Sequence, residues 1–215
     1  MNRNISPSLL SANFTDLKND INLVENLGVD RLHLDVMDGH FVPNLTFGPF
    51  IISQIREITK LHLETHLMIE NPDRYIAEYA KAGSDTIIIH YEASNDIMKD
   101  LKEIRSYGKK SGIAINPDTD YKLLKPYFND LDYILIMSVF PGFGGQKFIK
   151  STLDSMKYLV NNTKNHNITI GVDGGVNLST IDMVYETGID VTIVGSALYG
   201  ASNVRERYFE LINEK

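Results

Sequence analysis

Two histidines and two aspartates lie at the ends of short β-rich runs, where side chains from different strands can meet. In the run 31–36, His33 and Asp35 are two residues apart and so share one face of a strand. His66 lies near the end of a second run, and Asp173 directly follows a third. Alone, each fits a structural role such as a hydrogen-bonded pair, a half-buried histidine or a turn cap. Together, two imidazoles and two carboxylates suit a divalent metal, since a buried charge is costly unless it is paired or metal-bound.

Glycine-rich turns form a second group of candidates. β-rich runs lead into the segments 141–146 (PGFGGQ), 174–175 (GG) and 195–197 (GSA). Glycine lets the backbone approach a ligand closely, and successive N–H groups in such turns, with a helix N-terminus, bind anions. A single Gly-rich loop is usually a tight turn, but three on adjacent strands predict a phosphate site.

Methionines stand near the ends of three different strands, at Met37, Met68 and Met137. For any one of them, filling the core is the simpler explanation. Together, we expect them to form a dry, polarisable lid over the metal. The other histidines are interpreted as structural or solvated: His40, His62, His90 and His166.

The elements that would bring these residues together recur along the whole chain. Eight β-rich runs, which start about 20 to 35 residues apart, leave room for a crossover helix between each pair. They are 5–9, 31–36, 61–68, 86–90, 112–115, 133–139, 168–172 and 191–194. A helix, Gly-x-Asp, strand unit repeats at 28–30, 83–85 and 188–190. The pattern predicts an α/β fold, a single (β/α)₈ TIM barrel over residues 1–215, whose function collects at the C-terminal strand ends.

An open doubly wound sheet shares this alternation of strands and helices. No Gly-x-Gly-x-x-Gly follows the first strand, however, so a dinucleotide-binding fold is disfavoured. The barrel therefore remains the preferred prediction.

Composition sets the broad class of protein. The chain has 215 residues, of which 43% are hydrophobic and 23% charged, as in one ordinary globular domain. The absence of cysteine excludes disulfides, thiolate ligands and a cysteine nucleophile. A net charge of −7 argues against nucleic-acid and anionic-membrane partners. Because the longest apolar run, 133–137, is too short to span a bilayer and no apolar leader is evident, we expect a soluble cytoplasmic protein, and we expect a homo-oligomer.

Several motifs resemble those of the ribulose-phosphate 3-epimerase family, in order and over nearly the whole chain. They are 6–11 (SPSLLS), 33–44 (HLDVMDGHFVPN), 66–69 (HLMI), 137–139 (MSV), 141–146 (PGFGGQ), 172–176 (VDGGV) and 195–197 (GSA). The resemblance implies a metal-dependent epimerase of the pentose phosphate pathway that interconverts D-ribulose 5-phosphate and D-xylulose 5-phosphate.

The same resemblance implies roles for individual residues. His33, Asp35, His66 and Asp173 match the family's metal ligands, and Asp35 and Asp173 match its acid/base pair. One divalent ion, Zn²⁺, Fe²⁺, Mn²⁺ or Co²⁺, suits that ligand set. The residues that match the family's substrate contacts are Ser8, His66, Gly142, Phe143, Gly144, Gly145, Asp173, Gly174, Gly175, Gly195 and Ser196.

The chemistry of epimerisation agrees with two aspartates and a metal. Inverting a carbon beside a ketone requires removing its proton on one face and returning a proton on the other, so two bases must flank the substrate. Aspartate, with an ordinary pKa of about 3.9, is a weak base for a carbon acid. The cation must therefore carry much of the barrier by stabilising the cis-enediolate oxygens.

Three alternative functions remain. D-Allulose-6-phosphate 3-epimerase is the close alternative, because Phe140 and the segment 116–120 depart from the family pattern near the sugar-facing rim. A lysine-dependent aldolase or decarboxylase would need a lysine at a strand end, and the runs that carry the histidines and aspartates offer none. A non-catalytic sugar-phosphate-binding barrel is disfavoured because it would not need both aspartates.

Overall fold

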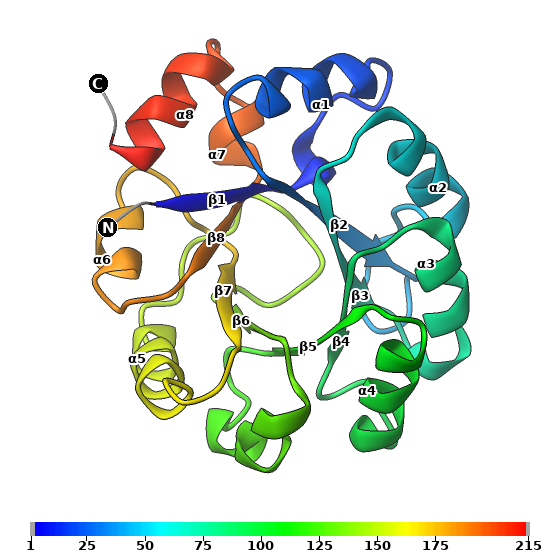
Figure 1. Ribbon diagram of the computed structural model, residues 1–215. Helices are drawn as coiled ribbons and strands as arrows, with labels where there is room; N and C mark the ends of the chain where they lie inside the picture. Colours follow the sequence, from blue (N-terminus) through cyan, green and yellow to red (C-terminus); the bar gives the residue numbers. More distant parts are fainter. Residues whose placement is uncertain (1–2, 214–215) are drawn as a thin grey trace.

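The structure is a computed structural model that describes residues 3–213 of the chain. Parallel strands form the inner wall of a nearly closed barrel, with helices around them (Figure 1). The strands are β1 (Asn4–Pro7), β2 (Arg31–Met37), β3 (His62–Met68), β4 (Thr86–His90), β5 (Lys110–Ile115), β6 (Tyr133–Met137), β7 (Thr169–Asp173) and β8 (Val191–Val194). Their hydrogen-bonded order is β1-β8-β7-β6-β5-β4-β3-β2. The predicted (β/α)₈ TIM barrel is confirmed, in a single domain.

The barrel closes between its first two strands through the residue that follows β1. β1 pairs with β8, with Ile5 opposite Thr192, and β2 pairs with β3, with His33 opposite Glu64. β1 and β2 are linked by an isolated parallel bridge from Ser8 to His33. Closure therefore places Ser8 beside β2, at the C-terminal end of β1.

Helices connect the strands on the outside of the barrel (Figure 1). They are α1 (Leu17–Glu25), α2 (Pro49–Ile58), α3 (Ile76–Ala82), α4 (Ile97–Ser106), α5 (Thr152–Asn162), α6 (Ile181–Tyr185), α7 (Ser196–Tyr199) and α8 (Val204–Ile212), with the 3₁₀ helices η1 (Leu9–Ser11), η2 (Pro72–Arg74) and η3 (Tyr121–Asp130). Local chemistry sets their ends: the Asp96 side chain accepts the Lys99 N–H at the start of α4, and Gly83 ends α3 in the left-handed conformation. Within residues 3–213, no helix is long and apolar enough to cross a membrane.

Two segments depart from a simple strand and helix alternation. The first strand ends at Pro7 rather than at Leu9, because the Ser8 side chain accepts the Leu10 N–H and starts the turn of η1. The crossover after β5 is the 3₁₀ helix η3, which contains Pro126. Proline has no N–H for an α-helical hydrogen bond, so a regular α-helix is disfavoured there.

Strand alternation divides the core into two regions. Leu34 and Val36 face outward and belong to the large apolar cluster under the helices. Leu135 and Ile193 face inward and belong to a separate cluster within the barrel. His33 and Asp35, which alternate with Leu34 and Val36 along β2, therefore point inward, as the alternation of polar and apolar residues predicted.

The Tyr133 ring fills part of the interior next to two glycines. A Cβ at Gly171 would lie 2.9 Å from ring carbons of Tyr133, and one at Gly112 would lie 3.2 Å from the Tyr133 Cβ. A larger residue at either position would occupy the space of the ring. The barrel interior is therefore a packed core rather than a pore.

Candidate active site

A cavity of about 270 Å³ opens at the C-terminal ends of the strands. Most residues that the sequence assigned to the site line it: Ser8, Asp35, Met37, Met68, Met137, Gly142, Phe143, Gly144, Gly145, Asp173, Gly174, Gly175, Gly195 and Ser196. His33 and His66 are fully buried and do not line it. Sequence reasoning did not single out Ser11 and Gln146, which also line the cavity, although both stand inside the family motifs.

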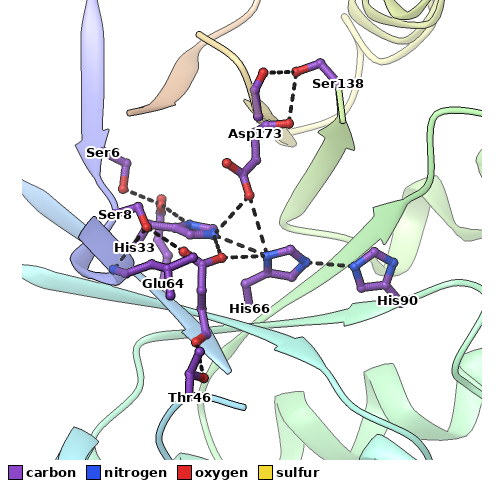
Figure 2. Close-up of polar contacts among 12 residues, drawn as sticks. Ser6, Ser8, His33, Thr46, Glu64, His66, His90, Ser138 and Asp173 are labelled. Atoms are coloured by element: carbon purple, nitrogen blue, oxygen red, sulfur yellow. Dashed lines mark hydrogen bonds and ion pairs between the residues drawn. The ribbon is translucent and has the colours of Figure 1, made fainter. Parts of the chain in front are cut away.

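The four predicted metal ligands come together in one cluster (Figure 2). His33 Nε2 lies 3.4 Å from Asp35 Oδ1 and 3.9 Å from Asp173 Oδ2. His66 Nδ1 lies 3.3 Å from Asp35 Oδ1 and 3.8 Å from Asp173 Oδ2. The two ring nitrogens are 3.3 Å apart. Each residue thus offers one donor atom within 4.8 Å of the other three.

This donor set fits a divalent cation. Four ligands at about 2.1 Å from a tetrahedral ion stand about 3.4 Å from one another, which is close to the separations within the cluster. Two imidazole nitrogens and two carboxylate oxygens also suit the first-row divalent ions. The cluster could therefore hold a metal ion, although the ligand roles of its members stay a prediction.

The pKa values of the two aspartates shift in opposite directions. Burial favours the neutral acid of Asp35, but His33 and His66 outweigh it and hold the Asp35 pKa well below its ordinary value. The pKa of Asp173 rises to about 7, because burial and the Asp35 charge both favour its neutral form. One aspartate is thus held as a carboxylate, while the other binds a proton near neutral pH.

The two histidines of the cluster also differ. Burial lowers the pKa of His66 to about 3, so its ring is neutral. Burial opposes protonation of His33 as well, but the Asp35 carboxylate, with further help from Glu64 and Asp173, overcomes it and raises the His33 pKa to about 10. The negative charge of the cluster therefore draws a positive charge to its centre, from a proton or from a cation.

Hydroxyl groups hold both aspartates in place (Figure 2). Ser8 Oγ donates to Asp35 Oδ2 at 2.5 Å, and Thr46 Oγ1 donates to the Asp35 carbonyl at 2.7 Å. The Ser138 N–H donates to the Asp173 carbonyl at 2.7 Å, and the Ser138 hydroxyl lies 2.9 Å from the same oxygen. The backbone of each aspartate is therefore anchored by a residue from another segment.

Glu64 is a buried carboxylate behind His33. Its Oε2 accepts from Ser6 Oγ at 2.8 Å, and its Oε1 accepts from Arg31 at 2.9 Å. The same Oε2 lies 3.7 Å from His33 Nδ1, an atom without a hydrogen-bond partner in the described part of the chain. Alternation with His66 along β3 was a signal in the sequence that Glu64 points into the barrel.

His90 stands behind His66 and is fully buried. The two Nε2 atoms are 2.9 Å apart, and His90 Nδ1 lies 3.0 Å from Glu92 Oε2. The interpretation of His90 as a structural or solvated residue therefore missed its contact with the cluster. The inward-facing Ile88 stands two residues earlier on β4, so alternation could have indicated the direction of the ring.

Glycines line the wall of the cavity where the backbone comes close to other atoms. A Cβ at Gly195 would lie 2.7 Å from Ser11 Oγ. At Gly175, where φ is +65°, a Cβ would lie 2.6 Å from the Phe148 nitrogen. α7 begins directly after Gly195, so its first N–H groups have no helical acceptor. This wall therefore consists of closely packed backbone, and the free N–H groups at the start of α7 belong to it.

The loop that follows β6 is braced by side-chain amides. Gln146 Nε2 donates to the carbonyls of Phe140 and Phe143 at 2.7 and 2.9 Å. Asn44 Nδ2 donates to the Gly142 carbonyl at 2.7 Å. Both phenylalanine side chains remain exposed, so the braced loop carries two aromatic rings at the rim of the barrel.

The three methionines line the same cavity. Met37 and Met68 are opposite each other across β2 and β3 and pack with Val42, whereas Met137 packs with the barrel interior. Their role as a lid over a metal stays a prediction.

Comparison with known proteins gives one family. The model of the ribulose-phosphate 3 epimerase family matches residues 4–199. The ribulose-phosphate 3-epimerase of Bacillus subtilis is 44% identical, over 98% of this chain and 99% of the relative. The enzyme of the same name from Synechocystis is 42% identical, over 100% of this chain and 96% of the relative. Among solved structures, a mutant tryptophan synthase alpha-subunit from Pyrococcus furiosus is 14% identical with a TM-score of 0.72, over 99% of this chain and 100% of that one, which supports the fold alone.

Proposed function

The chain belongs to the ribulose-phosphate 3-epimerase family, and from this premise we propose that it inverts C3 of D-ribulose 5-phosphate to give D-xylulose 5-phosphate. Family membership makes the chain an epimerase. The single observation that supports the finer proposal is the pair Asp35 and Asp173, two carboxyl groups that line one cavity from different strands. Such a pair supplies one proton acceptor and one proton donor.

The two aspartates would act from different sides of the ketose. Asp35 lies two residues before the end of β2, and Asp173 ends β7. β1 and β8 stand between these strands in the barrel. A carboxylate oxygen of Asp35 would take the C3 proton from one face, and the carboxylic acid of Asp173 would return a proton to the other. In the reverse direction the two residues exchange roles, as microscopic reversibility requires. Ser8 would keep one Asp35 oxygen oriented through its hydrogen bond.

The cluster of His33, Asp35, His66 and Asp173 would hold the metal of this reaction. A divalent Zn²⁺, Fe²⁺, Mn²⁺ or Co²⁺ supplies, when bound, the positive charge that stabilises the oxygens of a cis-enediolate. The burial of both histidines keeps water from their ring nitrogens.

The glycine wall would bind the phosphate of the substrate. The chain carries a net charge of −7, so long-range attraction does not gather an anionic sugar. Binding must come from local N–H groups at Gly175, Gly195, Ser196 and the loop 142–145. Ser8, Phe143 and Gly174, which line the cavity, and the buried His66 complete the proposed substrate contacts.

The test follows solvent deuterium into the product. In D₂O, the wild-type protein should place deuterium at C3 of xylulose 5-phosphate. Asp35→Asn and Asp173→Asn should each reduce kcat for epimerisation by at least about 10³-fold, because each removes one of the two bases. Asp154→Asn, an exposed aspartate of α5, is the matched control and should leave kcat unchanged.

The same assay, run on a panel of ketose phosphates, tests which sugar phosphate is the substrate. Ribulose 5-phosphate should give a higher kcat/KM than allulose 6-phosphate. A higher value for allulose 6-phosphate would reassign the substrate but keep the mechanism. Near-normal epimerisation by either asparagine variant would overturn the two-base mechanism itself.

A further inference from the structure

Resting on the metal site of the proposed function, we propose that His90 and Glu92 are positioning residues that hold His66 in the one tautomer able to bind a cation. The contact is direct: His66 Nε2 points away from the cluster to His90 Nε2, 2.9 Å away (Figure 2). His90 Nδ1 in turn lies 3.0 Å from Glu92 Oε2. A chain of three side chains therefore leads from His66 to a carboxylate outside the cluster.

Glu92 determines where the protons lie along this chain. Its other oxygen, Oε1, accepts from the Asn116 N–H at 2.8 Å and from the Thr119 hydroxyl. Both oxygens of Glu92 therefore face hydrogen-bond donors, as those of an ionised carboxylate do. An ionised carboxylate accepts only, so the proton between His90 and Glu92 must be on His90 Nδ1.

The tautomer of His66 follows from that assignment. With its proton on Nδ1, His90 can accept a hydrogen bond at Nε2, and only one proton fits between two nitrogens 2.9 Å apart. That proton belongs to His66 Nε2. In the metal-loaded protein the lone pair of His66 is then on Nδ1, the atom that faces Asp35 and Asp173. The opposite tautomer would place a proton between the ligands and break the chain to Glu92.

Packing keeps the chain from rearranging. The His90 side chain is fully buried, and its ring stacks on His66 with centroids 5.0 Å apart and an interplanar angle of 25°. The Phe41 ring also packs against the His90 ring, with the two ring centroids 4.8 Å apart. The support of His33 is looser, because its Nδ1 lies 3.7 Å from Glu64 Oε2, beyond hydrogen-bond distance. We therefore assign His66 as the more firmly oriented of the two histidines.

The first test measures metal affinity rather than turnover. Zn²⁺ or Co²⁺ is titrated into metal-stripped protein against a chromophoric chelator. His90→Phe keeps the stacked ring but removes the acceptor, and it should weaken affinity by about 10- to 100-fold, as loss of a ligand's outer partner does. His90→Gln should recover most of that affinity, because its amide can accept from His66 and donate to Glu92. His62→Phe is the control. His62 contacts Thr86 and no member of the cluster, so this substitution should leave metal affinity unchanged.

The second test observes the protons directly. Long-range ¹H–¹⁵N spectra of the Zn²⁺-loaded wild type should show His66 protonated at Nε2 and His90 at Nδ1. The Co²⁺-loaded His90→Phe variant should show an altered visible spectrum, whereas His90→Gln should keep that of the wild type.

Two results would overturn the inference and leave the proposed metal site intact. One is wild-type affinity and an unchanged Co²⁺ spectrum in a folded His90→Phe protein. The other is a His90 ring protonated at Nε2 in the metal-loaded wild type. Failure of the wild type itself to bind either metal would instead overturn the metal site and, with it, the positioning role.

Discussion

A single methyl group at Gly195 tests the proposed phosphate wall. In Gly195→Ala, the new Cβ would lie 2.7 Å from Ser11 Oγ and 3.5 Å from Ser8 Cβ. Ordinary contact begins at 3.4 Å, so the Ser11 hydroxyl, which lines the cavity, must move away by about 0.7 Å. Displacement of a positioning group on this scale reduces rates by about 10²-fold. We therefore expect kcat/KM for ribulose 5-phosphate to fall about 10²-fold, or about 2.7 kcal/mol of transition-state stabilisation.

The comparison with an unphosphorylated sugar isolates the cause. In the wild type, removing the phosphate should reduce kcat/KM by about 10³-fold, because remote binding energy fixes the ketose for reaction. Gly195→Ala should act mainly on ribulose 5-phosphate, so its preference for that sugar over free ribulose should shrink to about tenfold. Gly195→Asp, which adds a charge, should go further without changing metal content.

Gly48→Ala is the matched control in a coupled steady-state assay. Its Cβ would meet nothing within 4 Å, and its φ of −114° suits any residue. Its kcat/KM values for ribulose 5-phosphate and for free ribulose should then both equal those of the wild type. An equal loss for both sugars in Gly195→Ala would refute the assignment of this wall to the phosphate, and so would equal turnover of both sugars by the wild type.

The remaining predictions concern the metal and the barrel core. A chelator should abolish activity and Zn²⁺, Fe²⁺, Mn²⁺ or Co²⁺ should restore it, whereas full activity in protein shown metal-free by elemental analysis would exclude the metal site. In the same elemental analysis, His33→Ala and His66→Ala should each retain less metal, while His166→Ala should match the wild type. Gly171→Ala should lower the free energy of unfolding in urea by about 1–3 kcal/mol, because its Cβ would overlap the Tyr133 ring; an unchanged midpoint would contradict that packing argument.

Much of the barrel could be predicted from the sequence because its signals are local. The strand 31–37 shows this well: a period of two puts His33 and Asp35 on one face and Leu34 and Val36 on the other, and the structure has them so. The spacing between β-rich runs likewise indicated a crossover before each new strand. The end of β1 was predicted too late, because the apolar pair Leu9 and Leu10 continues the strand pattern while the Ser8 side chain begins a turn.

The supporting residues of the site were harder to predict, because their partners are remote in the chain. His90 alone at the end of a strand has the pattern of any buried histidine. Its meaning depends on the pairing of β3 with β4, which brings it next to His66. The orientation of Glu92 depends on Asn116, which follows β5 and donates its N–H to the Glu92 carboxylate. Ser138 and Thr46 act through backbone carbonyls, and a hydroxyl of that kind leaves no distinctive pattern in a sequence.

The seam between β1 and β2, where the bridge from Ser8 to His33 closes the barrel, relates the order of synthesis to the completion of the pocket. β1 precedes the other strands of the barrel in the sequence, but β8, its hydrogen-bonded partner in the sheet, follows them all and begins at Val191. The bridge from Ser8 to His33 and the hydrogen bond from Ser8 to Asp35 both cross that seam. A nascent chain with one strand missing therefore lacks a complete pocket. The complete pocket forms only when the barrel closes, so turnover by the proposed site would report complete folding of the molecules that show it.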